Sequence, residues 1–356
     1  MRPSFYQYSF QELSRLCEHE NLGKTTASLL FNWYYKKNQI DPCNLNALPL
    51  RAKAFTESKL SFNRPRVEQV QESLDRTVKF LFQMQDGLSV ETVLIPFHNK
   101  YTICLSSQVG CAMNCSFCFT GKQGFTRHLR TEEIINQILM AKSWLTQHRP
   151  GDDRILNVVF MGQGEPLHNF DAVKKAIEIL ISQHGLSLAV HKITVSTAGY
   201  LPGLRRWAQE MPRVNLALSL HSPFSEKRQS LIPIDKVYPL DEIMKAIDDI
   251  PLEEKRFITY EYLLIKGIND GSEDAKATGQ LLQGKKAYLN LIPFNPFPGA
   301  AYERPEQASI LRFKKIAEDY GVIVTLRTTK GDEILAACGQ LRSPKPKIDK
   351  EGFGAR

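Results

Sequence analysis

The chain alternates between strand-like and helix-like segments from residue 101 onward, and this alternation constrains its fold more than any other feature. Helices are expected at 131–147, 171–183, 241–249, 274–282 and 309–320. Strands are expected at 101–106, 155–161, 191–196, 214–220, 257–265 and 287–292, with a last one at 322–327. Such alternation favours parallel strands joined by right-handed crossovers. Six units, fewer than the eight of a closed barrel, predict an α/β fold with an open, partial (βα)6 barrel.

Polar or glycine-containing turns follow five of these strands. Barrels of this class form their sites at the carboxyl ends of the strands. Any one of these turns could be an ordinary tight connection, but five at matching positions predict a ligand pocket. The turns are the cysteine-rich loop after the first strand, MGQGEP at 161–166, STAG at 196–199, SLHS at 219–222 and NPFPG at 295–299.

Three cysteines in the first of these loops have the spacing C-x-x-x-C-x-x-C, at Cys111, Cys115 and Cys118. Three thiolates on one loop can hold three corners of an iron–sulfur cluster, for which four cysteines are the usual complement. The fourth iron would then have an open position, as the metal of a catalytic zinc site does. Zinc and three buried apolar cysteines are the alternatives. A cluster is favoured because the loop has no second C-x-x-C pair.

The segment before residue 101 has a different pattern. Residues 1–60 look helical, with a capping box at Ser9 and Glu12. Residues 78–82 and 90–95, separated by Asp86-Gly87, predict a β-hairpin. We therefore predict an N-terminal helical/β accessory domain at 1–90, a catalytic domain at 91–342 and a basic tail at 343–356. The accessory domain is a candidate for RNA contact, and a purely stabilising role is the alternative.

Charge and cysteine content narrow the class of protein. The formal net charge is +8 and the isoelectric point about 9.0, which favours a polyanionic partner. Seven cysteines that include the loop triplet indicate a reducing compartment rather than a disulfide framework. No run reaches the ~18 apolar residues of a membrane span, so a soluble, cytoplasmic protein without membrane contact is expected. Basic residues flank the predicted chemistry at Lys122, Arg127, Arg130, Arg342, Lys345, Lys347 and Lys350.

Six motifs together resemble the RlmN/Cfr family of radical S-adenosylmethionine (SAM) RNA adenosine methyltransferases, and RlmN in particular. The resemblance covers most of residues 90–342. It implies a radical SAM barrel with a [4Fe–4S] cluster and SAM as cofactors. The motifs are CLSSQVGCAMNCSFC at 104–118, GQGEPLHN at 162–169, STAG at 196–199, SLHSP at 219–223, NLIPFNPFPG at 290–299 and AACGQL at 336–341.

The resemblance also implies roles for individual residues. Cys111, Cys115 and Cys118 would be the cluster ligands. Gly164 and Glu165 would contact the methionine end of SAM. The remaining polar groups of SAM would be contacted by Ser196, Ser219, Leu220, His221 and Asn295.

Three further residues would perform the methyl transfer. Cys338 matches the cysteine that this family methylates first, a nucleophilic step suited to a thiolate. A radical formed from a second SAM would then activate that methyl group for addition to the adenine ring. Glu91 matches the proposed proton acceptor. Cys104 would help to release the product, leaving a Cys104–Cys338 disulfide. Without the resemblance, either cysteine could equally be a core thiol.

The implied reaction is methylation of C2 of an adenosine in 23S rRNA, unassembled or partly assembled, and of the adenosine 3′ to the tRNA anticodon. An external electron donor such as flavodoxin and a monomeric state are expected with it. The alternative within the family is Cfr-type methylation of C8, which confers antibiotic resistance. Phe119, Gln163 and Ser222 depart from the usual RlmN pattern, and Ser222 matches Cfr. The alternative from another class is a non-catalytic iron–sulfur RNA-binding protein.

Overall fold

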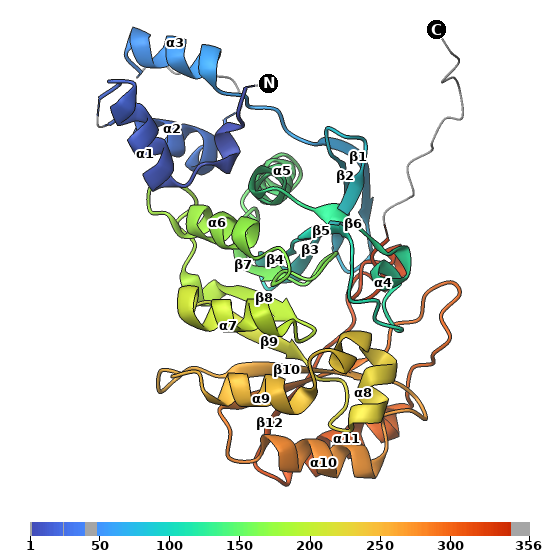
Figure 1. Cartoon of the computed structure of the whole chain (residues 1–356). Coiled ribbons are helices and arrows are strands. Elements are labelled where there is room, and N and C mark those ends of the chain that lie inside the picture. Colours follow the sequence, from blue (N-terminus) through green and yellow to red (C-terminus); the bar gives the residue numbers. More distant parts are fainter. Residues whose placement is uncertain (1, 24, 40–47, 343–356) are drawn as a thin grey trace, which may run out of the picture.

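One twisted sheet of ten strands organises the part of the chain that the structure describes (Figure 1). The structure is a computed structural model, and it describes residues 2–23, 25–39 and 48–342. In spatial order the strands are β1 (Arg66–Glu72), β2 (Val78–Gln83), β3 (Ser89–Phe97), β4 (Lys100–Cys104), β7 (Ile155–Phe160), β8 (Ile193–Thr197), β9 (Asn215–Ser219), β10 (Ile258–Leu264), β11 (Ala287–Pro293) and β12 (Ile323–Leu326).

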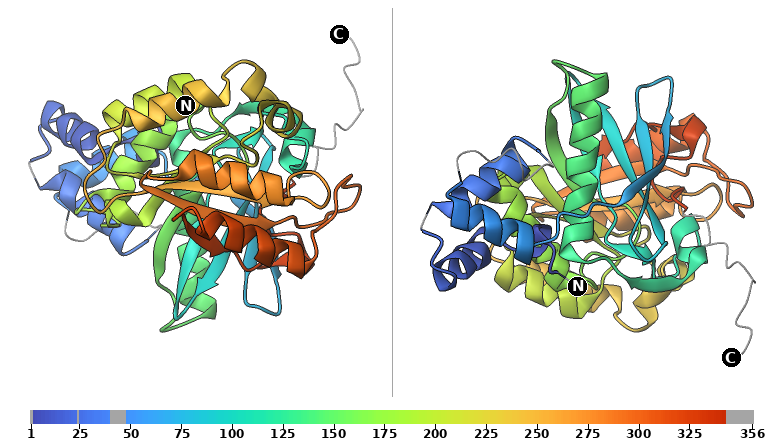
Figure 2. Two further views of the ribbon diagram at one scale, coloured as in Figure 1. Left: turned by 90° about the horizontal axis from the view of Figure 1, so that it is seen from below. Right: turned by 90° about the horizontal axis from the view of Figure 1, so that it is seen from above.

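The strands from β4 to β12 pair in parallel, which confirms the predicted barrel-type arrangement. Helices cover the outer face of the curved sheet (Figure 2), as parallel strands require for their crossovers. In chain order they are α5 (Thr131–His148), α6 (Phe170–Ile181), α7 (Leu201–Glu210), α8 (Ser225–Leu231), α9 (Leu240–Asp248), α10 (Ser272–Leu282) and α11 (Gln307–Glu318).

Amphipathic spacing explains how these helices attach to the sheet. In α9 the buried residues are Leu240, Ile243, Met244 and Ile247, at positions i, i+3, i+4 and i+7 of one helical face. That face packs into the core, while Asp241 and Glu242 occupy the first turn, where negative charge stabilises the helix.

Two helices that the sequence analysis did not predict, α7 and α8, complete the units after β8 and β9. Pro202 and Gly203 concealed α7, because both residues disfavour helix interiors. Pro202 is tolerated in the first turn. Gly203 is required because a Cβ there would lie 2.3 Å from the carbonyl oxygen of Leu167.

The predicted hairpin is confirmed: β2 and β3 pair antiparallel around the turn at Asp86-Gly87. It does not stand apart from the barrel, since β3 also pairs antiparallel with β4. β1, which was not predicted, adds an outer strand. The hairpin thus extends the same sheet, and the predicted boundary at residue 90 falls inside β3. The division into domains stays a prediction.

The N-terminal helices pack beside α6 (Figure 1). Ser9 and Glu12 form the predicted capping box at the start of α1 (Phe10–His19). Phe10 stacks on His184 with ring centroids 3.8 Å apart, and Glu12 pairs with Lys175 at 2.7 Å. The remaining elements of this region are α2 (Thr26–Phe31), a π-helical turn (Asn32–Lys36) and α3 (Leu50–Lys59).

None of the helices in the described ranges is long and apolar enough to cross a membrane.

Candidate active site

Two adjoining pockets lie at the carboxyl ends of the parallel strands, where the sequence predicted a ligand pocket. The first, here called the cysteine pocket, has a volume of about 920 Å³, and the second pocket about 1230 Å³. Four residues line both pockets: Met161, Ile292, Arg327 and Cys338.

The loop after β4 folds tightly around its three cysteines. It contains β5 (Gln108–Gly110), α4 (Phe119–Gln123) and β6 (Phe125–His128), with β5 and β6 paired antiparallel. Gly110 has a φ of +73°, and a Cβ there would lie 1.8 Å from the carbonyl oxygen of Gly124. Only glycine permits this approach of the two sides of the loop.

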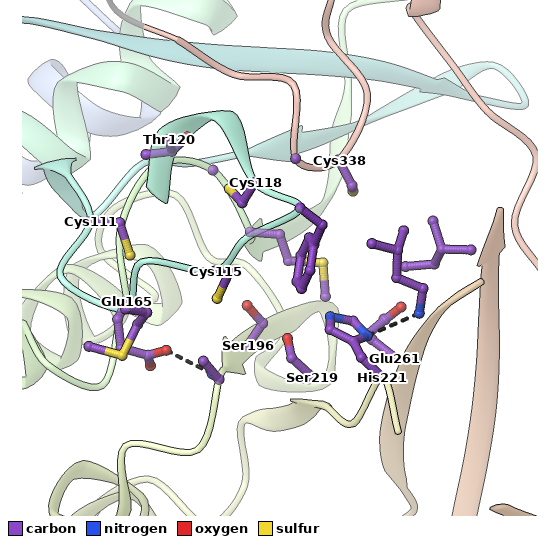
Figure 3. A pocket seen from close by; sticks show the side chains of 18 of the residues that line it. Cys111, Cys115, Cys118, Thr120, Glu165, Ser196, Ser219, His221, Glu261 and Cys338 are labelled. Carbon is purple, nitrogen blue, oxygen red and sulfur yellow. Dashed lines mark hydrogen bonds between the residues drawn. The ribbon is translucent and has the colours of Figure 1, made fainter. Parts of the chain in front are cut away.

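Cys111, Cys115 and Cys118 all line the cysteine pocket and lie on one side of it (Figure 3). Burial raises the pKa of Cys111 to about 12 and also raises the pKa of Cys115 and of Cys118. Buried thiols of this kind become thiolates readily when they coordinate a cation. The donor set therefore fits a [4Fe–4S] cluster held by three cysteines.

In the described part of the chain, no group of three or more His, Cys, Asp or Glu side chains is spaced to hold one metal ion. Cysteines around a cluster each bind a different iron, so a cluster does not require the three thiols to converge on one ion.

Glu165 is one of two glutamates that line the cysteine pocket, the other being Glu261. The carboxylate of Glu165 accepts hydrogen bonds from the backbone N–H groups of Ala198, at 2.8 Å, and Leu167, at 3.1 Å. Burial nevertheless raises the pKa of Glu165 to about 7. A buried carboxylate of this kind is stabilised by a cationic ligand, so the residue fits the amino group of an amino acid moiety. Gly164 beside it has a φ of +101°, and a Cβ there would meet Gln108 at 2.5 Å.

The ends of β8 and β9 and the turn after β9 complete the opposite wall, with Ser196, Ser219 and His221 among its lining residues (Figure 3). His221 accepts a hydrogen bond on Nδ1 from the backbone N–H of Leu263 at 3.0 Å. Burial lowers its pKa to about 3, so the ring is neutral. Leu220 is fully buried and its N–H donates to the carbonyl oxygen of Glu261 at 2.9 Å. Leu220 therefore positions its neighbours and does not line the pocket.

Asn295 lies apart from this group. It lines the second pocket, and its Oδ1 accepts a hydrogen bond from the hydroxyl of Thr329 at 2.8 Å. Its assignment to SAM stays a prediction.

Cys338 and Cys104, more than two hundred residues apart in the sequence, both line the second pocket. Cys338 also faces the cysteine pocket. Cys104 is buried with Ala336 and Leu341, the neighbours of Cys338, in one apolar cluster. Burial, with a contribution from Cys338, raises the pKa of Cys104 to about 12. Both thiols are free in the structure.

Glu91 is held beneath the segment that carries Cys338. One carboxylate oxygen pairs with Nζ of Lys79 at 3.0 Å, and the other accepts the backbone N–H of Arg342 at 2.6 Å. Glu91 is only 5% exposed and is not among the residues that line the two pockets. Burial raises its pKa, while Lys79 lowers it.

Several residues of the site were missed by the sequence analysis. Arg327 follows β12 at its carboxyl end, so the rule that located the other turns would have found it. Glu261 is a lone acid in the apolar strand β10, a signal that was available. Arg228, fully buried in α8, pairs with the fully buried Asp235, and nothing local in the sequence indicates that contact.

The basic residues that were predicted to contact RNA differ in whether acidic side chains of the protein already pair with them. Arg127 binds Asp86 at 2.7 Å and Glu133 at 2.8 Å, and Arg130 binds the same Glu133 at 3.3 Å. These two arginines thus stabilise the start of α5. The guanidinium of Arg342 instead lies over the ring of Phe119 at 4.9 Å. Lys345, Lys347 and Lys350 lie outside the described residues.

Comparisons with known proteins agree with this geometry. The model of the Radical SAM superfamily matches residues 105–278. The dual-specificity RNA methyltransferase RlmN of Pelobacter propionicus is 42% identical over 91% of this chain and 90% of its own length. The dual-specificity RNA methyltransferase RlmN of Nitratiruptor sp. is 37% identical over 91% of this chain and 94% of its own. A crystal structure of a radical SAM methyltransferase from Sphaerobacter thermophilus is 36% identical and superimposes with a TM-score of 0.89, covering 96% of this chain and 99% of the other.

Proposed function

The chain belongs to the RlmN family of dual-specificity RNA methyltransferases in the radical SAM superfamily, and we propose that it methylates C2 of adenosine in two RNAs. The substrates are an adenosine of 23S rRNA, before or during ribosome assembly, and the adenosine 3′ to the tRNA anticodon. Cys338 carries the methyl group between SAM and the RNA base.

The position of Cys338 is the observation that carries this proposal. Its side chain borders both pockets, so one thiol can meet a ligand in the cysteine pocket and a second ligand in the neighbouring pocket. A methyl carrier needs this placement, because the donor and the acceptor must each reach the same sulfur. A cysteine that served only packing would not need to face either pocket.

The cysteine pocket would hold the cofactors. Cys111, Cys115 and Cys118 would ligate the cluster, and Glu165 would bind the amino group of SAM, with Ser196, Ser219 and His221 lining the rest. When bound, the cluster and SAM supply the one-electron chemistry that activates the methyl group on Cys338. Met113 and Phe117 also line this pocket and would help to exclude water from it.

The second pocket would receive the adenine, which must leave its base stack to be modified. Cys104 lines that pocket and would displace Cys338 from the methylated base by forming a disulfide with it. An external electron donor such as flavodoxin would reduce the cluster, and a separate two-electron reductant would restore both thiols. Glu91 would accept the proton released from the ring. We further propose that the enzyme works as a monomer in the cytoplasm, where such a disulfide can be reduced.

The test is the position of the methyl group on RNA. The anaerobically reconstituted protein is incubated with SAM, a reductant and 23S rRNA or tRNA, and the modified nucleoside is located by mass spectrometry. We expect 2-methyladenosine in both RNAs, and its absence in Cys338→Ala. Methylation at C8 would assign the Cfr-type reaction instead. Loss of SAM cleavage as well as methylation would indicate a non-catalytic protein.

Cys17→Ala is the matched control, because Cys17 is a buried thiol in α1, remote from both pockets. It should leave methylation unchanged. If Cys338→Ala still methylated RNA, Cys338 would not be the carrier.

A further inference from the structure

We propose that Lys79 is a positioning residue that, through Glu91, fastens the Cys338 segment in a closed position over Glu91. The Cys338 segment is defined here as residues 335–342. The inference rests on the proposed function in one respect only, namely that Cys338 and Glu91 take part in the methyl transfer.

Lys79 and Glu91 contact both ends of the Cys338 segment. At its start, Nζ of Lys79 donates to the carbonyl oxygen of Leu335 at 3.3 Å. At its end, the N–H of Arg342 donates to Glu91 at 2.6 Å. The two side chains form an ion pair at 3.0 Å, so this pair links the contact at the start of the Cys338 segment to the contact at its end.

The ion pair is shielded from water. Lys79 is 8% exposed and Glu91 5% exposed, and a charged pair at such a site is screened little by salt. Removing one partner leaves the other buried without its counter-charge, which is strongly unfavourable. The contacts to Leu335 and Arg342 therefore depend on both charges being present.

The neighbouring turn between β1 and β2 supports the same region. Asp75 accepts a hydrogen bond from the N–H of Gly331 at 3.1 Å, and Glu333 accepts one from the N–H of Leu74 at 3.2 Å. The β1–β2–β3 strands thus hold the approach to the Cys338 segment as well as the segment itself. This gives the antiparallel extension of the sheet a role at the site.

The closed position has a consequence for the reaction. Glu91 lies under the segment and outside the two pockets, so the segment must move before Glu91 meets a substrate. Once Glu91 has gained a proton, it no longer carries the charge that holds Lys79, and its bond with the Arg342 N–H weakens. The proton transfer would therefore loosen the segment at the stage when the product leaves.

Hydrogen exchange on the full-length protein, without SAM or RNA, tests the closed position directly. Lys79→Met and Glu91→Gln are each expected to speed amide exchange in residues 335–342 by roughly tenfold or more, because exchange there reports local opening. Peptides from β8 and β9 should exchange as in the unaltered protein. Lys79→Arg retains the charge and is expected to stay within about twofold of the unaltered rate.

Lys286→Met provides the matched control. Lys286 likewise donates to backbone carbonyl oxygens, those of Leu252 and Glu253, but it is exposed and lines neither pocket. It should leave exchange in the segment unchanged.

The proposal is overturned if Lys79→Met leaves the segment's exchange unchanged. It is also overturned if exchange accelerates equally throughout the sheet, which would show a general loss of stability, or if Lys79→Arg exchanges as fast as Lys79→Met. These outcomes are independent of RNA methylation. A protein with a fastened segment and no methylation would refute the proposed function alone.

Discussion

The buried ion pair between Arg228 and Asp235 offers the sharpest test of how the site is held together. Both side chains are fully buried. The guanidinium of Arg228 also donates to the carbonyl oxygens of Ala198 and Ser219 at 2.9 Å each and of Leu220 at 3.1 Å. Ala198 directly follows β8, while Ser219 ends β9 and Leu220 directly follows it. One side chain therefore ties together two strand ends that line the cysteine pocket.

The Arg228→Met substitution removes all of these contacts. Leaving Asp235 buried without its partner costs about 3–5 kcal/mol, and the lost hydrogen bonds to the three carbonyls add about 1 kcal/mol each. We therefore expect the free energy of unfolding to fall by about 6–8 kcal/mol, a large part of the roughly 5–15 kcal/mol of a typical domain. The change should be visible as a lower midpoint in urea unfolding followed by circular dichroism.

The double variant Arg228→Met/Asp235→Leu separates the charge from the carbonyl contacts. Because it leaves no buried unpaired carboxylate, it should recover at least about 2 kcal/mol relative to Arg228→Met. A loss below about 1 kcal/mol in Arg228→Met, within the range of ordinary surface substitutions and exposed pairs, would show that the buried pair does not stabilise the fold. A double variant as unstable as the single one would show that the unpaired carboxylate is not the cause of the loss.

Three further outcomes are expected. Burial lowers the pKa of His221 from 6.5 to about 3, so the free energy of unfolding should fall as the pH drops from 6.5 towards 3. The variant His221→Asn should flatten that pH dependence in urea titrations at several pH values, because asparagine tolerates the φ of +56° at this position but does not titrate. Arg127→Ala should lower the free energy of unfolding by about 2 kcal/mol, because Glu133 loses its charge-assisted hydrogen bonds from Arg127 but keeps Arg130. RNA affinity in filter binding should stay within about twofold, and a larger loss would assign Arg127 to RNA contact. Gly203→Ala should destabilise by about 1–3 kcal/mol, since its Cβ would meet Leu167, and an unchanged thermal midpoint would contradict the tight contact between α7 and that loop.

The parallel part of the fold was predictable because its signal is local. Apolar strands and amphipathic helices alternate along the chain, and the right-handed crossovers between them follow from general rules.

The failure to predict α7 has a physical explanation. Pro202 and Gly203 concealed α7 because propensity alone disfavours a helix there, whereas the first-turn position and the contact with Leu167 favour it.

The candidate site was predictable to the extent that its residues follow strands. Cys111, Cys115, Cys118 and Glu165 do so, Ser196 and Ser219 lie at the ends of strands, and all six line the cysteine pocket. Lys79 could not be found in this way. Lys79 lies within β2 of the hairpin. Its proposed role depends on contacts with Glu91 and with the carbonyl oxygen of Leu335, and no local sequence pattern indicates either contact.

The order of strands and helices, the cysteine spacing and the turns that form the cysteine pocket can be read from the amino-acid sequence. That the chain returns after β12 to place Cys338 between two pockets and near Glu91 is visible only in the folded structure. The same holds for Lys79 and Arg228, which are buried charges with specific partners. The difference arises because periodicity and turn chemistry depend on residues that are close in the sequence, whereas the energy of a buried charge depends on residues that only folding brings together.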